Sequence, residues 1–208
     1  MIAFTVLVVI LSTAALVWAV VSAPPAMRPL KMLASSGFIA VALATGALSS
    51  SYGKIVLVAL SLSWIGDLLL TFDSRRGFVG GLISFLLGHV AYSAAFGTLG
   101  LDPAVSAVAA VVVVVIGVFV WRWLSPHVGD MQGPVIAYIV IISTMVALAF
   151  GTFAHGSTWL IPVGATFFFV SDLFVARNQF VEPGIMNRAW GLPLYYTAQV
   201  LLALSVMD

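Results

Sequence analysis

The chain has 208 residues, of which 62% are hydrophobic and only 7% are charged, and its mean hydropathy is +1.20. A soluble domain carries roughly a quarter charged residues, so this composition excludes an ordinary soluble domain and indicates an integral membrane protein. The net charge of +1 and the lack of a charged tail give no sign of a nucleic-acid partner, and the lack of cysteine excludes disulfides, thiolate metal sites and a cysteine nucleophile.

Eight apolar stretches are long enough to cross a membrane as helices, because a spanning helix needs about 20 predominantly apolar residues. In chain order they are residues 2–21, 32–48, 55–72, 78–97, 104–124, 135–153, 159–176 and 190–206. We expect the first to be a helix rather than a secretory signal, because no positively charged segment precedes it and its apolar run is long. The connections are short and carry turn residues or charge. The sequence therefore predicts one all-α domain, residues 1–208, formed by a single bundle of eight transmembrane helices.

The basic residues predict how this bundle is oriented, because Lys and Arg favour the cytoplasmic side of a membrane. Seven of the eight Lys and Arg residues lie in, or within three residues of, the first, third, fifth and seventh connections, whereas Lys54 lies in an even-numbered one. We therefore expect a multi-pass protein of the cell membrane with both termini on the non-cytoplasmic side.

Two of the predicted helices carry an aspartate inside a similar heptapeptide, WIGDLLL at residues 64–70 and FVSDLFV 105 residues later. Both helices run from the outside inward, so Asp67 and Asp172 are expected at similar depth, in the last turns before the cytoplasmic face. The spacing leaves open whether the bundle consists of two parallel four-helix repeats, whose interface would be a natural place for a site.

Ionisable residues inside membrane segments are rare and costly, and they usually face the bundle interior or a wet cavity. Asp67 and Asp172 are therefore the first candidates for a functional site. The alternative is that each reaches the membrane surface or pairs with an Arg of an inner connection. His89 lies deeper, about 18 Å past Gly77 along the fourth helix, and shares a helix face with Tyr92. A single buried histidine is often only a hydrogen-bonded packing residue, and both interpretations are kept.

Other polar residues of the predicted helices could complete such a site. Tyr195 and Gln199 lie four residues apart on one face of the eighth helix, where they either contribute to the site or form hydrogen bonds between helices. Ser63 lies one turn before Asp67 and could donate a hydrogen bond to that carboxylate or to its own helix.

Three basic residues at the inner helix ends, Arg28, Lys31 and Arg75, could bind a lipid phosphate. The preference of basic residues for the cytoplasmic side alone also explains their positions. No G-x-S-x-G, H-E-x-x-H or H-x-x-x-H pattern occurs in the sequence, which argues against a serine hydrolase or a His-rich metallohydrolase. Two Asp and one His could hold a divalent cation, but no ligand spacing favours this, so neither a metal nor a cofactor is predicted.

The order of these motifs resembles that of the YhhN-like family, the lysoplasmalogenases. The resemblance is carried by RPLKM, SWIGDLLL, GFVGGLISFLLGHVAY, GATFFFVSDLFVARNQF and YYTAQVLL, which together span nearly the whole chain. Each piece is mostly apolar around one polar residue, and their order within an eight-helix frame makes the match specific. The family often has Lys-Pro-Leu before the second helix, where this sequence has Arg28, Pro29 and Leu30.

The resemblance implies an activity, namely hydrolysis of the vinyl ether bond of a lysoplasmalogen to a fatty aldehyde and glycerophosphoethanolamine or glycerophosphocholine. It would carry functional roles over to Asp67, His89 and Asp172, with a basic position at Arg28 or Lys31. The expected partners are a lysophospholipid substrate and membrane lipids, and the sequence gives no indication of an oligomeric state.

The residues suit this chemistry independently of the resemblance. Hydrolysis of a vinyl ether begins with protonation of its β-carbon and passes through an oxocarbenium ion, as in glycosidases that use two carboxyl groups. One carboxyl must be protonated near neutral pH, which burial and a nearby like charge both favour, and the other ionised. Our hypothesis is that Asp67 and Asp172 converge between the third and seventh helices as acid and base, in either assignment. His89 and Tyr92 would orient water or the ether oxygen, and Arg28, Lys31 or Arg75 would hold the phosphate.

Two other functions fit the same sequence. A transporter of small molecules or lipids would also use carboxylates buried at a repeat interface, and would need a polar path across the membrane. In a non-catalytic lipid-binding or scaffold protein, substitution of the carboxylates would alter stability alone.

Overall fold

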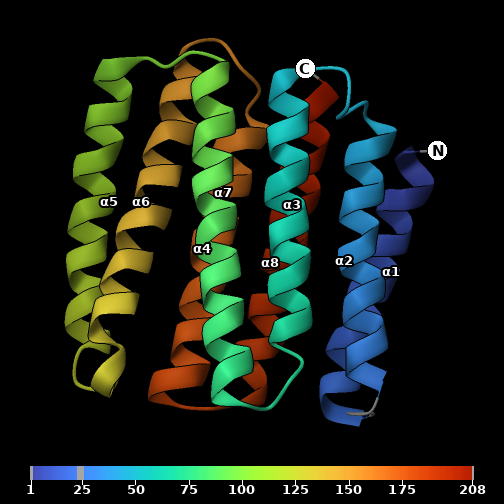
Figure 1. The fold of residues 1–208 in the computed structure, drawn as a ribbon, viewed down its shortest axis with the longest axis vertical. Helices are drawn as coiled ribbons and strands as arrows, with labels where there is room; N and C mark the ends of the chain where they lie inside the picture. The colour runs from blue at the N-terminus through green and yellow to red at the C-terminus, as the bar shows by residue number, and fades with distance from the viewer. Residues whose placement is uncertain (1, 23–25, 208) are drawn as a thin grey trace.

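The computed structural model describes residues 2–22 and 26–207, so residues 1, 23–25 and 208 of the predicted domain lie outside the description. Eight α-helices run through the described residues in one bundle, no strand occurs among them, and each helix is long and apolar enough to cross a membrane (Figure 1). The helices are α1 (Ile2–Ser22), α2 (Met27–Ala44), α3 (Ser51–Leu69), α4 (Arg75–Thr98), α5 (Pro103–Leu124), α6 (Gln132–Ala154), α7 (Leu160–Ala176) and α8 (Ile185–Leu204). Short 3₁₀ turns, η2 (Gly129–Met131) and η4 (Ser205–Met207), precede α6 and follow α8. The predicted eight-helix membrane bundle is confirmed.

Several helices begin earlier in the chain than hydropathy predicts. Helix α2 begins at Met27, so Arg28 and Lys31 belong to its first turns, and Pro29 is tolerated there because the first turn needs no amide donor. Helix α3 begins at Ser51 because the side chain of Ser50 caps it. Hydropathy marks the apolar part of a helix, whereas the helix itself continues through polar turns near the membrane surface.

The end of α7 differs most from the prediction. The chain does not leave the helix after Ala176 but continues as a π-helix, η3 (Arg177–Val181), which is closed by the amide of Glu182 donating to the carbonyl of Arg177. Asp172 is therefore followed by roughly two further helical turns, which the hydropathy prediction, ending at Ala176, did not include. Asp67 does lie in the last turn of α3, as predicted.

The helices form a ring with one helix outside it. Consecutive helices pack as the pairs α1–α2, α3–α4, α5–α6 and α7–α8, and the ring is closed by contacts of α2 with α3, α4 with α6, α6 with α7, and α8 with α1. Helix α8 also contacts α2 and α3, whereas α5 packs mainly on α6 at one edge of the bundle (Figure 1). Side chains from α2, α3, α4, α6, α7 and α8 can therefore meet inside the ring.

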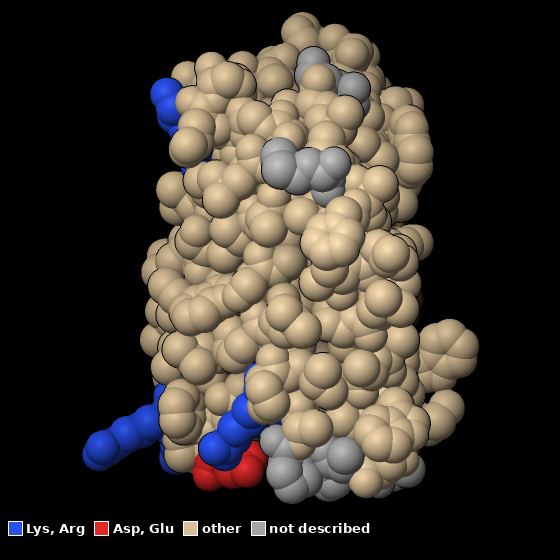
Figure 2. Space-filling model, turned by 90° about the vertical axis from the view of Figure 1, so that its right-hand side faces the viewer, with Lys and Arg blue, Asp and Glu red and all other residues tan. Residues whose placement is uncertain are grey.

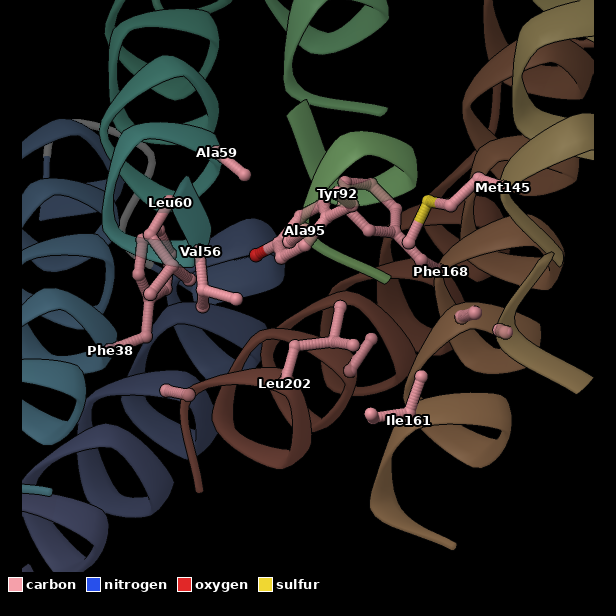
Figure 3. Packing of buried hydrophobic residues seen from close by; sticks show 14 of the residues in the cluster. Phe38, Val56, Ala59, Leu60, Tyr92, Ala95, Met145, Ile161, Phe168 and Leu202 are labelled. Carbon is pink, nitrogen blue, oxygen red and sulfur yellow. The ribbon is translucent and has the colours of Figure 1, made fainter. Parts of the chain in front are cut away.

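The interior of the ring is a continuous hydrophobic core. Side chains of α2, α3, α4, α6, α7 and α8 meet there, and Figure 3 shows Phe38, Leu60, Tyr92, Met145, Phe168 and Leu202 among them. Helices α3 and α4 approach each other closely at Gly66, where an added Cβ atom would lie 2.7 Å from the ring of Phe85. This close approach brings the segment that precedes Asp67 against α4.

The charged residues are concentrated at the two ends of the bundle. On the face shown in Figure 2, Lys, Arg, Asp and Glu lie near the ends, and a wide uncharged belt separates them. We call the end at which α2, α4, α6 and α8 begin the basic end, because seven of the eight Lys and Arg residues lie there: Arg28, Lys31, Arg75, Arg76, Arg122, Arg177 and Arg188. Lys54 lies at the start of α3, at the opposite end. The basic end is the one predicted to face the cytoplasm.

Candidate active site

Asp67 is the centre of a buried ion pair near the end of α3. Its side chain is 2% exposed, and its Oδ1 atom lies 3.1 Å from Nζ of Lys31 on α2. Its Oδ2 atom accepts hydrogen bonds from the hydroxyl of Ser35 at 2.6 Å and from the hydroxyl of Tyr195 on α8 at 2.7 Å. Both carboxylate oxygens are thus bonded, which offsets part of the cost of removing the two charges from water.

The Asp67 ion pair joins three helices. Lys31 and Ser35 lie one turn apart on α2, and Tyr196 of α8 donates to the carbonyl of Lys31 at 3.2 Å and lies 3.2 Å from the hydroxyl of Ser35. Sequence reasoning missed Ser35 and Tyr196. Spacing could have found Ser35, because it is four residues after Lys31 and so on the same helix face. Nothing in the sequence separates Tyr196 from its neighbour Tyr195.

Asp172 on α7 has neutral partners. Its side chain is 17% exposed, and its Oδ2 atom accepts a hydrogen bond of 2.8 Å from the hydroxyl of Tyr138 on α6. Nε2 of His89 on α4 lies 3.7 Å from the same oxygen, which is longer than a hydrogen bond. Within residues 2–22 and 26–207, no Lys or Arg pairs with Asp172. No feature of the sequence singles out Tyr138, because it lies in a long apolar helix.

His89 is enclosed by aromatic rings. Its side chain is fully buried, its ring centre lies 4.4 Å from that of Phe168, and it meets the ring of Tyr138 edge-on at 5.3 Å. Neither ring nitrogen has a hydrogen-bond partner in the described part of the chain. An unpaired buried polar atom costs about 1–3 kcal/mol, and such atoms in folded proteins usually mark a functional role or a bound group. Both nitrogens are therefore enclosed and lack a hydrogen-bond partner among the described residues.

A chain of buried polar groups leads from α4 to Asp67. Tyr92 lies one turn after His89 and donates a hydrogen bond of 2.6 Å to Oε1 of Gln199, and both side chains are fully buried. Tyr195 lies one turn before Gln199 on α8 and donates to Asp67. Tyr195 and Gln199 therefore share a face of α8, as predicted, and they connect the Asp67 ion pair to the helix that carries His89.

The two carboxyl groups do not bond directly to each other. No hydrogen bond or ion pair between Asp67 and Asp172 occurs among the described residues, and each has its own partners. Phe168 lies between the two groups, 5.4 Å from the ring of Tyr195 and 4.4 Å from that of His89, measured between ring centres. Figure 3 shows Phe168 beside Tyr92 in the middle of the bundle. The carboxyl groups thus belong to one interior but to two separate polar clusters.

Three further candidates lie apart from the carboxylates. Ser63 is fully buried and donates to the carbonyl of Ala59 at 3.0 Å, so it bonds to its own helix rather than to Asp67. Arg75 is exposed and pairs with Asp130 in the connection before α6. Arg28 is exposed too, with its guanidinium carbon 6.0 Å from the ring centre of Phe72. Of the three predicted phosphate-binding residues, only Lys31 contacts a candidate catalytic group.

The sequence profile of the YhhN family matches residues 26–206. The chain belongs to the YhhN family. Among curated proteins it is 32% identical to the lysoplasmalogenase TMEM86A of Bos taurus over 162 residues, which cover 74% of this chain and 65% of the bovine protein. It is 34% identical to a lysoplasmalogenase of Mycobacterium bovis over 178 residues, which cover 79% of this chain and 66% of that protein. No solved structure matches the chain.

The YhhN match confirms the resemblance inferred from the motifs. It begins at residue 26, so it leaves out α1 and includes every residue of the two carboxyl clusters. The chain spans about two thirds of the length of the bovine and mycobacterial relatives, so their activity does not transfer by similarity alone. Within the described ranges, no three His, Asp or Glu side chains form a group that could hold a metal ion.

Proposed function

We propose that the protein hydrolyses the vinyl ether bond of lysoplasmalogens and releases a fatty aldehyde together with glycerophosphoethanolamine or glycerophosphocholine. The named activity of the YhhN relatives supports this substrate. The observation that carries the proposal is the pairing of Asp172 with neutral Tyr138 beside His89, whose ring nitrogens have no partner among the described side chains. This arrangement offers a proton donor and a water-binding group in an apolar interior.

Asp172 is the general acid of the proposed reaction. An unpaired charge is costly inside a membrane bundle, and Asp172 has no cation among its described partners, so its neutral, protonated form suits this position. Tyr138 donates to Oδ2, which leaves Oδ1 to carry the proton. Asp67 is the opposite case, because Lys31 compensates its charge. The Lys31–Asp67 pair is neutral overall, so Asp67 holds α2, α3 and α8 together and takes no direct part in the proposed chemistry.

The proposed reaction balances without a cofactor. Asp172 transfers its proton to the β-carbon of the vinyl ether, and the positive charge is shared by the α-carbon and the ether oxygen. Water attacks the α-carbon while His89 accepts a proton from it, which gives a hemiacetal. The hydroxyl proton of the hemiacetal passes to the ether oxygen, the bond between the α-carbon and that oxygen breaks, and the oxygen leaves as the glycerol hydroxyl. The proton on His89 returns to Asp172, which restores the acid.

The test is aldehyde release by the purified protein in detergent, from a lysoplasmalogen and from the lysophospholipid with an ester in place of the vinyl ether. We expect aldehyde from the vinyl ether, and a fall in kcat of about 10³-fold in Asp172→Asn, because a general acid contributes about 10²–10⁴-fold. Asp130→Asn is the matched control, since this carboxylate lies exposed in a connection, and its kcat should not change.

Two results would contradict the proposal. Unchanged turnover in Asp172→Asn would remove Asp172 from the chemistry even if the protein hydrolyses the lipid. No aldehyde from folded protein would reject the hydrolase and favour the transporter, which uptake into proteoliposomes would then test.

We also propose that the protein lies in the cell membrane with its basic end toward the cytoplasm and both termini outside. The support is the concentration of seven Lys and Arg residues at that end. Because the chain has no cysteine, single cysteines introduced at Ser49 and at Ser125 can be labelled with an impermeant thiol reagent in intact cells. Labelling at Ser49 alone supports this orientation, and labelling at Ser125 alone reverses it.

A further inference from the structure

A polar cluster lies at the basic end of α7, where η3 leads into α8. It consists of Arg177, Asn178, Glu182 and Asn187, and we call it the Arg177 cluster. Asn187 is 3% exposed and donates to the carbonyl of Glu182 at 2.7 Å, while Oδ1 of Asn178 accepts from the amide of Gly184 at 3.0 Å. The π-helical turn that carries Arg177 is a rare conformation that is common at functional sites.

The guanidinium of Arg177 is held in place while part of it stays accessible. Nη1 donates to Oδ1 of Asn187 at 2.9 Å, and Nη2 donates to the carboxylate of Glu182. The side chain of Arg177 is 41% exposed. A guanidinium has five N–H donors in a planar fork that fits a phosphate, and the described residues engage Arg177 through two of its nitrogens. A phosphate could bind the remaining donors without disturbing Asn187.

The other basic residues near the site are less suited to bind a phosphate. Lys31 already neutralises Asp67, and moving it to a phosphate would leave a buried carboxylate unpaired. Arg75 is 72% exposed and pairs with Asp130 in a separate connection. Arg177 differs because a buried side chain, Asn187, fixes its position and because it lies on the same continuous helical stretch as Asp172.

The distance along this stretch matches the substrate. Arg177 follows Asp172 by five residues toward the basic end, which is a rise of about 7.5 Å. In a lysoplasmalogen five covalent bonds separate the vinyl ether oxygen from phosphorus, which span roughly 6 Å when extended. A lipid whose ether lies at Asp172 therefore has its phosphate near the level of Arg177, and its chain extends into the apolar interior.

We propose that Arg177 binds the phosphate of the lysophospholipid head group, with Glu182 as an internal counter-ion that the phosphate displaces. This inference rests on the proposed function, because it takes the lipid substrate and Asp172 as given. It also replaces Arg28 and Arg75 as the expected phosphate-binding residues. The site recognises the phosphodiester common to ethanolamine and choline lipids.

The test compares two vinyl ether substrates, a lysoplasmalogen and the 1-alkenylglycerol that lacks the phosphate. In Arg177→Gln we expect KM for the lysoplasmalogen to rise about tenfold or more, because a hydrogen bond to a charged group is lost, with no change for the alkenylglycerol. In Glu182→Gln we expect KM for the lysoplasmalogen to fall roughly threefold, because the guanidinium loses its competing anion. Arg122→Gln removes a basic residue at the same end and should change neither KM.

A purely structural role of the cluster would change both substrates alike and would impair both variants. Equal changes for the two substrates, or a rise in KM in Glu182→Gln, would overturn the proposal. Binding of the ester lysophospholipid is measured in parallel, since it requires no hydrolysis and separates failure of this site from failure of the enzyme. We expect weaker binding in Arg177→Gln and stronger binding in Glu182→Gln. Inorganic phosphate should not compete at equal concentration, and competition would assign the site to free phosphate instead.

Discussion

Asp67 and Asp172 occupy the same place in two similar heptapeptides but have different surroundings. Asp67 is 2% exposed and bonded to an ammonium group and two hydroxyls, whereas Asp172 is 17% exposed with one hydroxyl bond and an imidazole at 3.7 Å. The first carboxylate is saturated by its partners and holds three helices together. The second keeps an oxygen without a described bond. The comparison shows that two buried carboxyl groups in similar local sequence can have very different partners, which are set by the neighbouring helices.

The helices that supply the partners of Asp67 and of Asp172 nevertheless occupy equivalent positions in the two halves of the chain. The partners of Asp67 on α3 come from α2 and α8, and those of Asp172 on α7 come from α6 and α4. An exchange of two four-helix halves maps each set of helices onto the other, which supports the parallel repeat that the sequence left open. The correspondence fails at the first helix of each half, because α1 packs on both α2 and α8, whereas α5 packs mainly on α6.

The largest expected difference between the clusters is in stability. Lys31→Met leaves the buried carboxylate of Asp67 without its cation and should lower the free energy of unfolding by about 3 kcal/mol. Asp172→Asn should lower it by less than about 1 kcal/mol, because no charge loses a partner. Unfolding in mixed detergent micelles measures both. Adding Asp67→Asn to Lys31→Met should restore most of the loss, and a double variant as unstable as the single one would refute the ion pair as the cause.

The residue before each aspartate provides a second comparison. An added methyl group at Gly66 would lie 2.7 Å from the ring of Phe85, so Gly66→Ala should cost about 2 kcal/mol through overpacking. Ser171 donates only to the carbonyl of Phe168 in its own helix, so Ser171→Ala should cost less than about 0.5 kcal/mol. The midpoints of thermal unfolding in detergent distinguish the two. Equal midpoints would mean that α3 and α4 can move apart at Gly66 without penalty.

The two tyrosines bonded to the carboxyl groups separate activity from stability. Tyr138→Phe removes the described hydrogen bond to Asp172 and should lower kcat roughly tenfold, with little change in stability. Tyr195→Phe leaves Asp67 with Lys31 and Ser35, so it should cost about 1 kcal/mol of stability. Initial rates and unfolding curves are recorded for both variants. The reverse pattern would exchange the roles assigned to the two carboxyl groups.

The smallest effect is expected at the exposed ion pair between Arg75 and Asp130, whose side chains are 72% and 70% exposed. Asp130→Asn should change the free energy of unfolding by less than about 0.5 kcal/mol, because water and salt screen such pairs. The change in the free energy of unfolding is measured in the same assay as for Lys31→Met, so that the exposed pair can be compared with the buried Lys31–Asp67 pair. A loss of stability as large as that of Lys31→Met would show that burial does not explain why the Lys31–Asp67 pair contributes more than the Arg75–Asp130 pair.

The sequence predicted the parts of this molecule that depend on local composition. Eight apolar segments gave eight helices, and the depth of Asp67 and the shared face of Tyr195 and Gln199 followed from helix geometry. The π-helical turn after Asp172 was missed because it begins with three polar residues, Arg177, Asn178 and Gln179, so the apolar segment ends at Ala176. Lys31, Tyr195 and His89 were named as candidates, but Ser35 and Tyr138 were missed because the partners of each carboxyl group depend on which helices become neighbours. In particular, α4 packs against α6 rather than against α5, the next helix in the chain. This packing brings His89 of α4 and Tyr138 of α6 close to Asp172.

The ion pair between Lys31 and Asp67 also bears on how the chain enters the membrane. Helices are synthesised in order, and Lys31 precedes Asp67 by little more than one helix, so the cation is already present when the carboxylate of α3 needs compensation. Tyr138 and His89 likewise precede Asp172 in the chain. Tyr195, by contrast, is made last and completes the Asp67 cluster only when α8 arrives. A ribosome-bound chain that stops before α8 should therefore hold its early helices through Lys31 and Asp67, and the Asp67 cluster should be completed only once α8 has been added.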